Sequence, residues 1–179
     1  CLAYSNLKSP SDAIWFSAPC TGGSSWQSIN AARGPETRAK IQVHWDLFKK
    51  LWAAFEPIAL HAISVGAGVF IEWPRACRYW KDNRVSTFLT NHGFQFADFD
   101  GCMYGLTAPG GREIGKPINK PWRVACVNSS LPDRLCLKCD HTHEHAPCAG
   151  GLTKGTQGYT CEIGMIVHDS FRHDVSCRT

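Results

Sequence analysis

Thiols and imidazoles gather in the segment Cys-Asp-His-Thr-His-Glu-His-Ala-Pro-Cys, which covers residues 139–148. Two thiolates and two imidazoles satisfy a tetrahedral zinc ion, and four protein ligands leave no open position for water. We therefore expect a structural zinc site with the ligands Cys139, His143, His145 and Cys148. Cys136 and His141 are alternative ligands. Exposed histidines beside two free thiols are the competing explanation.

A second pair of reactive side chains follows two short apolar runs. Cys20 comes after the run 12–18 and Pro19 and opens a Gly/Ser-rich loop, and Glu72 comes after the run 69–71. A cysteine in such a place can act as a nucleophile, and a carboxylate can bind a base or an amine. The plainer readings stay open, because a free cysteine often behaves as a small buried hydrophobe and a glutamate can cap the next helix.

Alternating strands and helices must position these side chains. Apolar residues at spacings of three and four predict an amphipathic helix that begins near Glu36, and Pro57 should kink or break it. The residues of this stripe are Ile41, Trp45, Phe48, Trp52 and Phe55. We expect strands at 12–18, 69–71, 94–99 and 122–127, a helix over 82–92 capped by Gly93, and a last helix over 161–171.

This order of elements predicts an α/β fold with a Rossmann-like, mostly parallel sheet and a zinc-stabilised irregular C-terminal segment. We expect the α/β core to cover residues 1–130 and the zinc-binding extension to cover residues 131–179. Function in such sheets lies at the carboxyl ends of the strands. Cys20, Glu72 and Asp100 follow three predicted strands, so we expect an active site there.

The composition is that of a globular protein, with 44% hydrophobic and 19% charged residues in a chain of 179. A net charge of +4 permits contact with nucleic acid without requiring it. No apolar run approaches the roughly 20 residues that span a bilayer, so we expect no membrane partner. The chain begins at Cys1, and we expect it to be part of a larger polypeptide or assembly.

The 10 cysteines and 8 histidines allow two interpretations. They fit either the disulfide framework of a secreted protein or a reduced protein with metal ligands and buried thiols. The histidines beside Cys139 and Cys148 favour the second, which predicts an intracellular location in the cytoplasm or nucleus. The roles of four further cysteines stay open between thiol, ligand and disulfide partner: Cys77, Cys102, Cys126 and Cys161.

The chain resembles the cytosine-5 DNA methyltransferases in the order of strand, Pro19-Cys20, polar loop, long helix and a strand that ends in Glu72-Trp73-Pro74. Later segments resemble a divergent methylase-like group of mobile elements and phages: Asp100-Gly101-Cys102-Met103-Tyr104-Gly105, Lys116-Pro117, Pro121-Trp122-Arg123 and the Cys139-to-His145 spacing. Trp73 stands where the family has Asn. The segment 17–20 also resembles a distorted Ser/Asp-Pro-Pro-Tyr motif of amino-methyltransferases.

This resemblance implies a chemistry for two residues. Cys20 would attack C6 of a cytosine flipped out of the duplex, and Glu72 would hold the N3 edge of that base. The resemblance also implies S-adenosylmethionine as the methyl donor, bound by a Gly-rich loop that would lie upstream of Asp12 and outside this chain.

Two other functions fit the sequence. A non-catalytic, zinc-stabilised nucleic-acid-binding or structural module would use cations near the zinc segment, with Trp122 stacking on a base. Those cations are Lys116, Lys120, Arg123, Arg134 and Lys138. A cysteine hydrolase would pair Cys20 with a histidine base, and the candidates are His44, His61 and His92.

Overall fold

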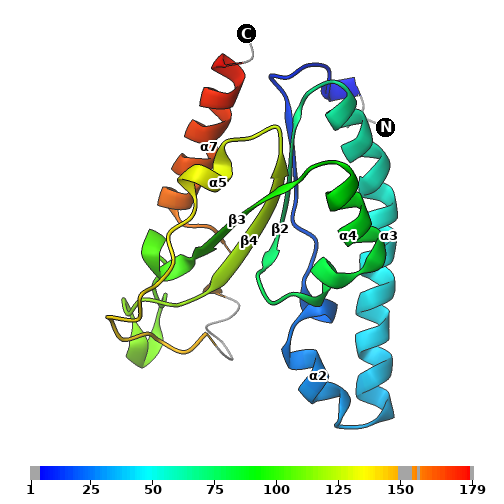
Figure 1. Cartoon of the computed structure of the whole chain (residues 1–179). Coiled ribbons are helices and arrows are strands. Elements are labelled where there is room, and N and C mark those ends of the chain that lie inside the picture. The colour runs from blue at the N-terminus through cyan, green and yellow to red at the C-terminus, as the bar shows by residue number, and fades with distance from the viewer. Residues whose placement is uncertain (1–4, 149–154, 157, 178–179) are drawn as a thin grey trace. The chain divides into compact units, whose positions relative to one another are not determined.

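The computed structural model describes residues 5–148, 155–156 and 158–177 and contains both strands and helices (Figure 1). The strands are β1 (Ala13–Phe16), β2 (Gly68–Pro74), β3 (Gln95–Asp100) and β4 (Pro121–Val127). The helices are α2 (Trp26–Ala31), α3 (Pro35–Ser64), α4 (Asn83–Asn91), α5 (Leu131–Arg134) and α7 (Cys161–Ser176). The predicted α/β class is confirmed.

The four strands form one sheet in the order β1-β2-β4-β3. β1 and β2 are parallel, with Phe16 opposite Ile71, whereas β4 runs antiparallel to both of its neighbours. The expected mostly parallel sheet is therefore wrong, and a Rossmann-like fold is not established. Parallel neighbours need a crossover, usually a helix, and the connection from β3 to β4 contains only short 3-10 turns.

Helix α3 runs for 30 residues and includes Pro57, so the expected break at this proline did not occur. Proline in a helix interior costs roughly 3 kcal/mol. Phe55 and Ala59, on either side of Pro57, are buried at 4% and 0% exposure. We attribute the continuity of α3 to this packing, because burying a large apolar side chain contributes about 1.5–3 kcal/mol.

Helix α4 begins and ends where the sequence predicts. The Asp82 carboxylate accepts the backbone N–H of Arg84 at 3.0 Å and caps the first turn. At the other end, Gly93 has φ 66°, and the N–H of Phe94 donates to the carbonyl of Leu89. This is a Schellman cap, which requires a left-handed residue and therefore favours glycine.

The chain divides into two compact units that differ from the predicted boundary at residue 130. Unit 1 contains residues 1–95 and 124–128, and unit 2 contains residues 96–123 and 129–179. The last residues of β4 thus belong to unit 1. The turn after β3 belongs to unit 2, together with the segment that carries the expected zinc ligands.

Aromatic side chains dominate the core of unit 1. Phe48 stacks on Tyr79 with ring centroids 3.7 Å apart, and Phe16 stacks on Phe55 at 4.2 Å. Trp52 and Trp73 are almost fully buried, at 0% and 1% exposure. The predicted stripe of α3 is confirmed for the residues Phe48, Trp52 and Phe55.

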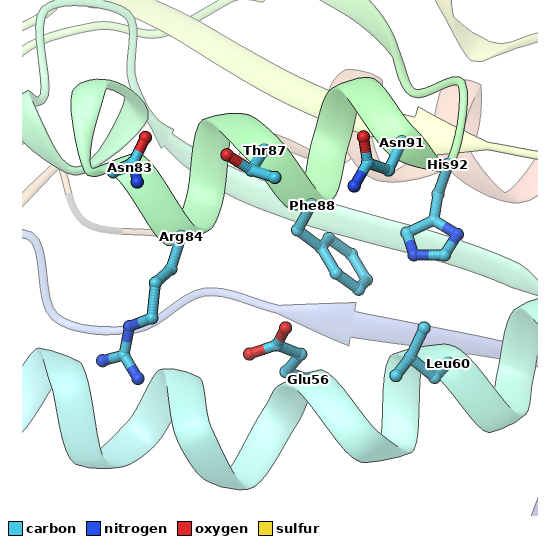
Figure 2. Close-up of a pocket in the computed structure, with 8 residues that line it drawn as sticks. All are labelled: Glu56, Leu60, Asn83, Arg84, Thr87, Phe88, Asn91 and His92. Atoms are coloured by element: carbon cyan, nitrogen blue, oxygen red, sulfur yellow. The ribbon is translucent and has the colours of Figure 1, made fainter.

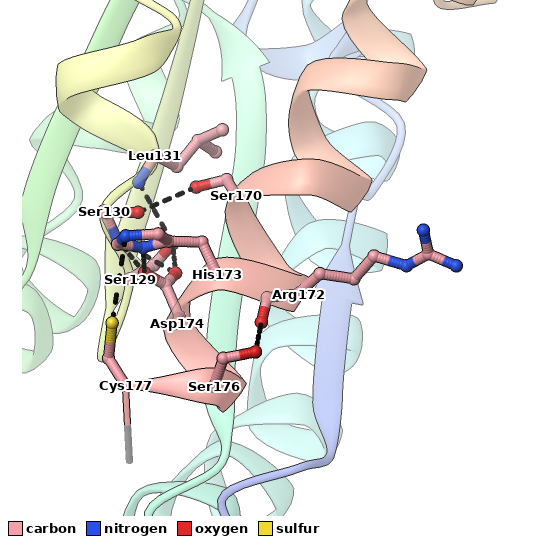
Figure 3. A network of polar contacts seen from close by, with 9 residues as sticks. All are labelled: Ser129, Ser130, Leu131, Ser170, Arg172, His173, Asp174, Ser176 and Cys177. Atoms are coloured by element: carbon pink, nitrogen blue, oxygen red, sulfur yellow. Dashed lines mark hydrogen bonds and ion pairs between the residues drawn. The ribbon is translucent and has the colours of Figure 1, made fainter. Parts of the chain in front are cut away.

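Helix α7 is fastened to unit 2 by a polar network that centres on Asp174 (Figure 3). The Asp174 carboxylate accepts the Ser130 backbone N–H at 3.0 Å and the Ser129 hydroxyl at 2.9 Å. Ser170 lies 3.2 Å from the Ser130 hydroxyl. Thr160 caps α7 by accepting the N–H of Ile163. The helix is longer than the expected span of 161–171.

Candidate functional site

Cys20 follows β1 after three intervening residues, and Glu72 lies within β2, two residues before the end of that strand. Because Phe16 pairs with Ile71, the next residues, Ser17 and Glu72, lie side by side, and the Ser17 hydroxyl donates to the Glu72 carboxylate at 2.6 Å. Glu72 is 6% exposed, and Cys20 is half-buried. Cys20 follows β1 as predicted, whereas the prediction that Glu72 comes after its strand is wrong, because β2 continues through Glu72 to Pro74.

Packing fixes the backbone on both sides of Cys20. The indole N–H of Trp73 donates to the carbonyl of Ala18 at 2.9 Å. After Cys20 the chain makes a 3-10 turn in which Gly22 and Gly23 are buried. A Cβ on Gly23 would lie 2.6 Å from the Cys77 sulfur, so only glycine lets the turn approach this closely. The backbone on both sides of Cys20 is thus closely packed.

Cys77 is a second thiol near this site that the sequence did not single out. Burial, with smaller contributions from the charges of Cys20 and Glu72, raises the pKa of Cys77 to about 12. Burial likewise raises the pKa of Tyr79 to about 12. Both groups are therefore neutral at physiological pH. Cys77 is inert in this state, whereas the half-buried Cys20 is the accessible thiol.

The expected histidine bases of a cysteine hydrolase are partly occupied elsewhere. The His61 ring lies 2.9 Å from the Leu7 carbonyl, and the His92 ring packs on Phe88 with centroids 4.7 Å apart.

Unit 2 brings four soft donor residues together into a possible metal centre: Cys102, Cys139, His143 and His145. One ligand atom from each lies within 4.8 Å of all the others. The Cys139 sulfur lies 3.7 Å from Nε2 of His143 and 3.4 Å from Nε2 of His145. This Cys/His cluster can hold a metal ion.

The fourth member of the cluster differs from the expected ligand set. Cys148 is not in the cluster, and its sulfur lies 3.8 Å from the Thr156 hydroxyl. The backbone N–H of Ala146 donates to the Pro117 carbonyl at 2.8 Å, and Ala146 is buried. This contact fixes the chain between His145, which is in the cluster, and Cys148, which is not.

Sequence reasoning placed Cys102 among the residues of undetermined role. It lies in the 3-10 turn Gly101–Tyr104 after β3. The signal that could have found it is its position directly after a strand end, but its distance along the chain from the histidines hid the connection. Of the alternative ligands, Cys136 and His141 are both exposed and outside the cluster.

The electrostatics of the cluster differ from one donor to the next. The pKa of the Cys102 thiol is raised to about 12. Burial is the largest cause, and a hydrogen bond with Cys139 and the charge of that residue are the next. Burial and the nearby charge of His143 lower the pKa of His145. The backbone N–H of His141 donates to the Cys139 sulfur at 3.3 Å. Such outer contacts orient ligands in metal sites.

Three of the five cations expected near a nucleic acid, Lys116, Lys120 and Arg123, have partners within unit 2. Lys116 is 2.8 Å from Glu113, and this hydrogen bond raises the pKa of Lys116. Lys120 donates to the Thr156 carbonyl at 2.6 Å and lies over the Trp122 ring. Trp122 is 1% exposed, so the expectation that its ring stacks on a base is wrong.

The third cation, Arg123, forms a two-point ion pair with Asp98. The two N···O distances are 2.6 and 2.7 Å, and the guanidinium lies over the Phe96 ring. The hydrogen bond with Asp98 raises the pKa of Arg123. This geometry joins β3 to β4. Arg134 and Lys138 are exposed.

A shallow groove of about 270 Å³ lies between α3 and α4 in unit 1 (Figure 2). Glu56 and Leu60 line it from α3, and residues from Asn83 to His92 line it from α4. Neither Cys20 nor Glu72 belongs to its walls. The groove is therefore separate from the site formed by Cys20 and Glu72.

Comparisons with known proteins found no match to the chain. No protein-family model, no curated protein and no solved structure matches the chain. Among the described residues, no helix is long and apolar enough to cross a membrane.

Proposed function

We propose that unit 1 is a methyltransferase-like domain that binds a cytosine of nucleic acid with Glu72 and attacks it with Cys20. The observation that carries the proposal is the Ser17–Glu72 hydrogen bond of 2.6 Å, because it puts the Glu72 carboxylate beside the strand end that leads into Cys20. The resemblance to cytosine-5 DNA methyltransferases assigns the same roles to the same two positions.

The proposed reaction begins with the cytosine flipped out of its stack. The Cys20 thiolate forms a bond to C6, and the electron pair of the C5–C6 double bond moves through C4 towards N3. A proton held between the Glu72 carboxyl group and N3 stabilises the electron-rich ring, and it returns to the carboxyl group when the thiolate leaves. C5 of this adduct is nucleophilic. When C5 takes up a proton and later returns one, loss of the thiolate restores the aromatic base.

The described residues do not fit S-adenosylmethionine, which would supply the methyl group. Before β1, the chain from Lys8 to Asp12 forms a single turn in which the Asp12 carboxylate accepts the N–H groups of Lys8 and Ser9. That turn is not a Gly-rich loop that leads into a helix. The chemistry proposed for this chain therefore ends at the covalent adduct and its reversal.

Exchange of the hydrogen at cytosine C5 with solvent tests this proposal without a methyl donor. Oligonucleotides incubated with the protein in D2O should gain deuterium at C5. Cys20→Ser should abolish the exchange, and Glu72→Gln should reduce it by at least about 100-fold, the scale of a lost general acid–base or hydrogen-bonding group. Cys136→Ser, at an exposed thiol, is the matched control and should exchange like the wild type. Absence of exchange by the folded wild type would overturn the proposal.

The second candidate is a metal-stabilised, non-catalytic module in unit 2, and the Cys/His cluster favours it. We propose zinc as the metal, because mixed thiolate and imidazole donors suit this ion. Binding of nucleic acid would use Lys116, Lys120 and Arg123. Their intrachain contacts leave few charges for phosphates, so we expect weak binding with a shallow salt dependence. Titration of a fluorescent oligonucleotide at several salt concentrations measures both.

A further inference from the structure

The donor atoms of the Cys/His cluster are spaced like the corners of a tetrahedral zinc site. Bond lengths of about 2.3 Å to sulfur and 2.0–2.1 Å to nitrogen place neighbouring S and N donors about 3.6 Å apart. The Cys139 sulfur lies 3.7 Å from His143 Nε2 and 3.4 Å from His145 Nε2. Two pairs of donors from one short segment therefore already have this spacing, and all four donors lie within 4.8 Å of one another.

We propose that the fourth ligand of this zinc ion is Cys102, and that the ion ties the turn after β3 to the segment around residues 137–146. The inference rests on the zinc binding proposed above and adds the ligand set and the role of the metal. Cys139, His143 and His145 complete the coordination. Four protein ligands leave no position for a substrate, so the centre is structural.

Backbone contacts hold the two segments in the register that this assignment needs. The N–H of Asp100 donates to the Leu137 carbonyl at 3.0 Å, and the N–H of Leu137 donates to the Tyr104 hydroxyl at 2.8 Å. The N–H of Cys139 donates to the Asp100 carboxylate at 3.0 Å, although these residues are 39 positions apart. Cys102 lies between Asp100 and Tyr104, and these bonds therefore bring it beside Cys139.

The turn that carries Cys102 cannot easily move away. A Cβ on Gly101 would lie 2.7 Å from a methyl group of Leu106 and 3.0 Å from the Trp122 ring. The Tyr104 side chain is 1% exposed and packs edge-on against Phe99. A preformed position for one ligand favours metal binding, because less ordering has to accompany coordination.

The metal would close a long loop in a part of the chain with little regular structure. After the four-residue α5, residues 136–148 form neither helix nor strand. A cross-link between distant positions stabilises by reducing the freedom of the unfolded chain. Structural zinc adds binding free energy directly to the stability of the fold.

Paired cysteine variants test the assignment. Purified wild-type protein should contain one zinc per chain by elemental analysis. Cys148→Ser should retain that zinc, whereas Cys102→Ser should lose most of it. Replacement of zinc by cobalt gives a second reading, because sulfur-to-cobalt charge-transfer absorption grows with the number of thiolate ligands. Cys148→Ser should keep the wild-type spectrum with its two thiolates.

Each outcome separates this inference from the proposals on which it stands. If Cys148→Ser changes the cobalt spectrum while Cys102→Ser leaves it intact, the ligand assignment is wrong and zinc binding stands. If the wild type binds neither zinc nor cobalt, the assignment and the metal-stabilised module both fail. The Cys148→Ser spectrum decides the question even where Cys102→Ser does not fold. None of these results bears on the chemistry proposed for Cys20 and Glu72.

Discussion

Two neighbouring thiols of unit 1 illustrate how local surroundings separate residues of one type. Cys77 is 3% exposed, and burial is the main reason that its pKa is raised to about 12. Cys20 is half-buried. Since the thiolate is the reactive form, the burial and raised pKa of Cys77 disfavour its reaction, and Cys20 is the more accessible thiol.

Alkylation with iodoacetamide at pH 8 should therefore modify Cys20 and leave Cys77 unmodified. Peptide mass spectrometry after a short exposure measures the two extents. The same treatment in denaturant should label both, which controls for the detection of each peptide. Equal labelling of Cys77 in the folded protein would contradict the burial on which the proposed role of Cys20 depends.

Two glycines should respond in opposite directions to the same substitution. In Gly23→Ala the new Cβ would lie 2.6 Å from the Cys77 sulfur and 2.9 Å from the Tyr79 ring. Such overpacking typically costs about 1–3 kcal/mol. Gly164 lies inside α7, and no atom lies within 4 Å of the place that an added Cβ would take. Gly164→Ala should therefore raise the free energy of unfolding by up to about 1 kcal/mol. Urea unfolding of both variants measures the difference.

At the scale of elements, regular periodicity made some structure predictable. The apolar stripe of α3 and the C-terminal cap of α4 at Gly93 depend on nearby residues, and the sequence predicted both. β4 runs antiparallel because the connection from β3 contains no helix that could serve as a crossover. Helix α3 continues through Pro57 because the residues on both sides of the proline are packed. Cys102 joins the cluster through contacts with residues more than thirty positions away. These outcomes depend on tertiary contacts that no local pattern contains.

The polar network that joins Asp174 of α7 to Ser129 and Ser130 should stabilise the fold to an extent that depends on pH. Burial raises the pKa of Asp174, but hydrogen bonds from Ser130 and Ser129 outweigh this effect, and the pKa is lower than the ordinary 3.8. A carboxyl with a depressed pKa stabilises the fold above the unfolded value, and this stability is lost as pH falls through the folded value.

Asp174→Asn should consequently lower the free energy of unfolding at pH 7 by about 1–3 kcal/mol, the contribution of hydrogen bonds to a charged group. The difference from wild type should shrink as pH falls below about 3.8, where the wild-type carboxyl takes up its proton. Thermal unfolding across this range measures it. Asp169→Asn, at an exposed position of the same helix, should show no such dependence.

The ion pair between β3 and β4 should be structural more than nucleic-acid binding. Arg123 and Asp98 are 26% and 19% exposed and make a two-point contact. Arg123→Ala should destabilise the protein by about 1–3 kcal/mol, because it leaves a half-buried carboxylate without its cation. Arg123→Lys should recover only part of the loss, since ammonium cannot reproduce the fork. Full stability in Arg123→Ala would contradict this role.

At the scale of the whole molecule, the interactions that stabilise the interior of unit 1 differ from those that stabilise the interior of unit 2. Unit 1 has a continuous aromatic core around α3 and β2. Unit 2 has its own buried residues, including Phe99, Trp122 and Ile163, but much of its chain runs without regular structure. The metal centre lies in the second unit. A metal that stabilises one unit should therefore leave a local signature when it is removed.

Chelation should accordingly increase amide hydrogen exchange in unit 2 and leave α3 protected. The amides to follow are those of Leu137, Cys139 and Ala146, which donate to Tyr104, Asp100 and Pro117. Their bonds fix the segment that the ion would hold, so its loss should open them first. Amides in the middle of α3 serve as internal controls, because their helix packs into the core of unit 1. Protection lost equally in α3 would mean that the ion stabilises the whole chain, and protection unchanged in both units would contradict a structural metal. Mass spectrometry of peptic peptides, with and without added zinc, distinguishes these results.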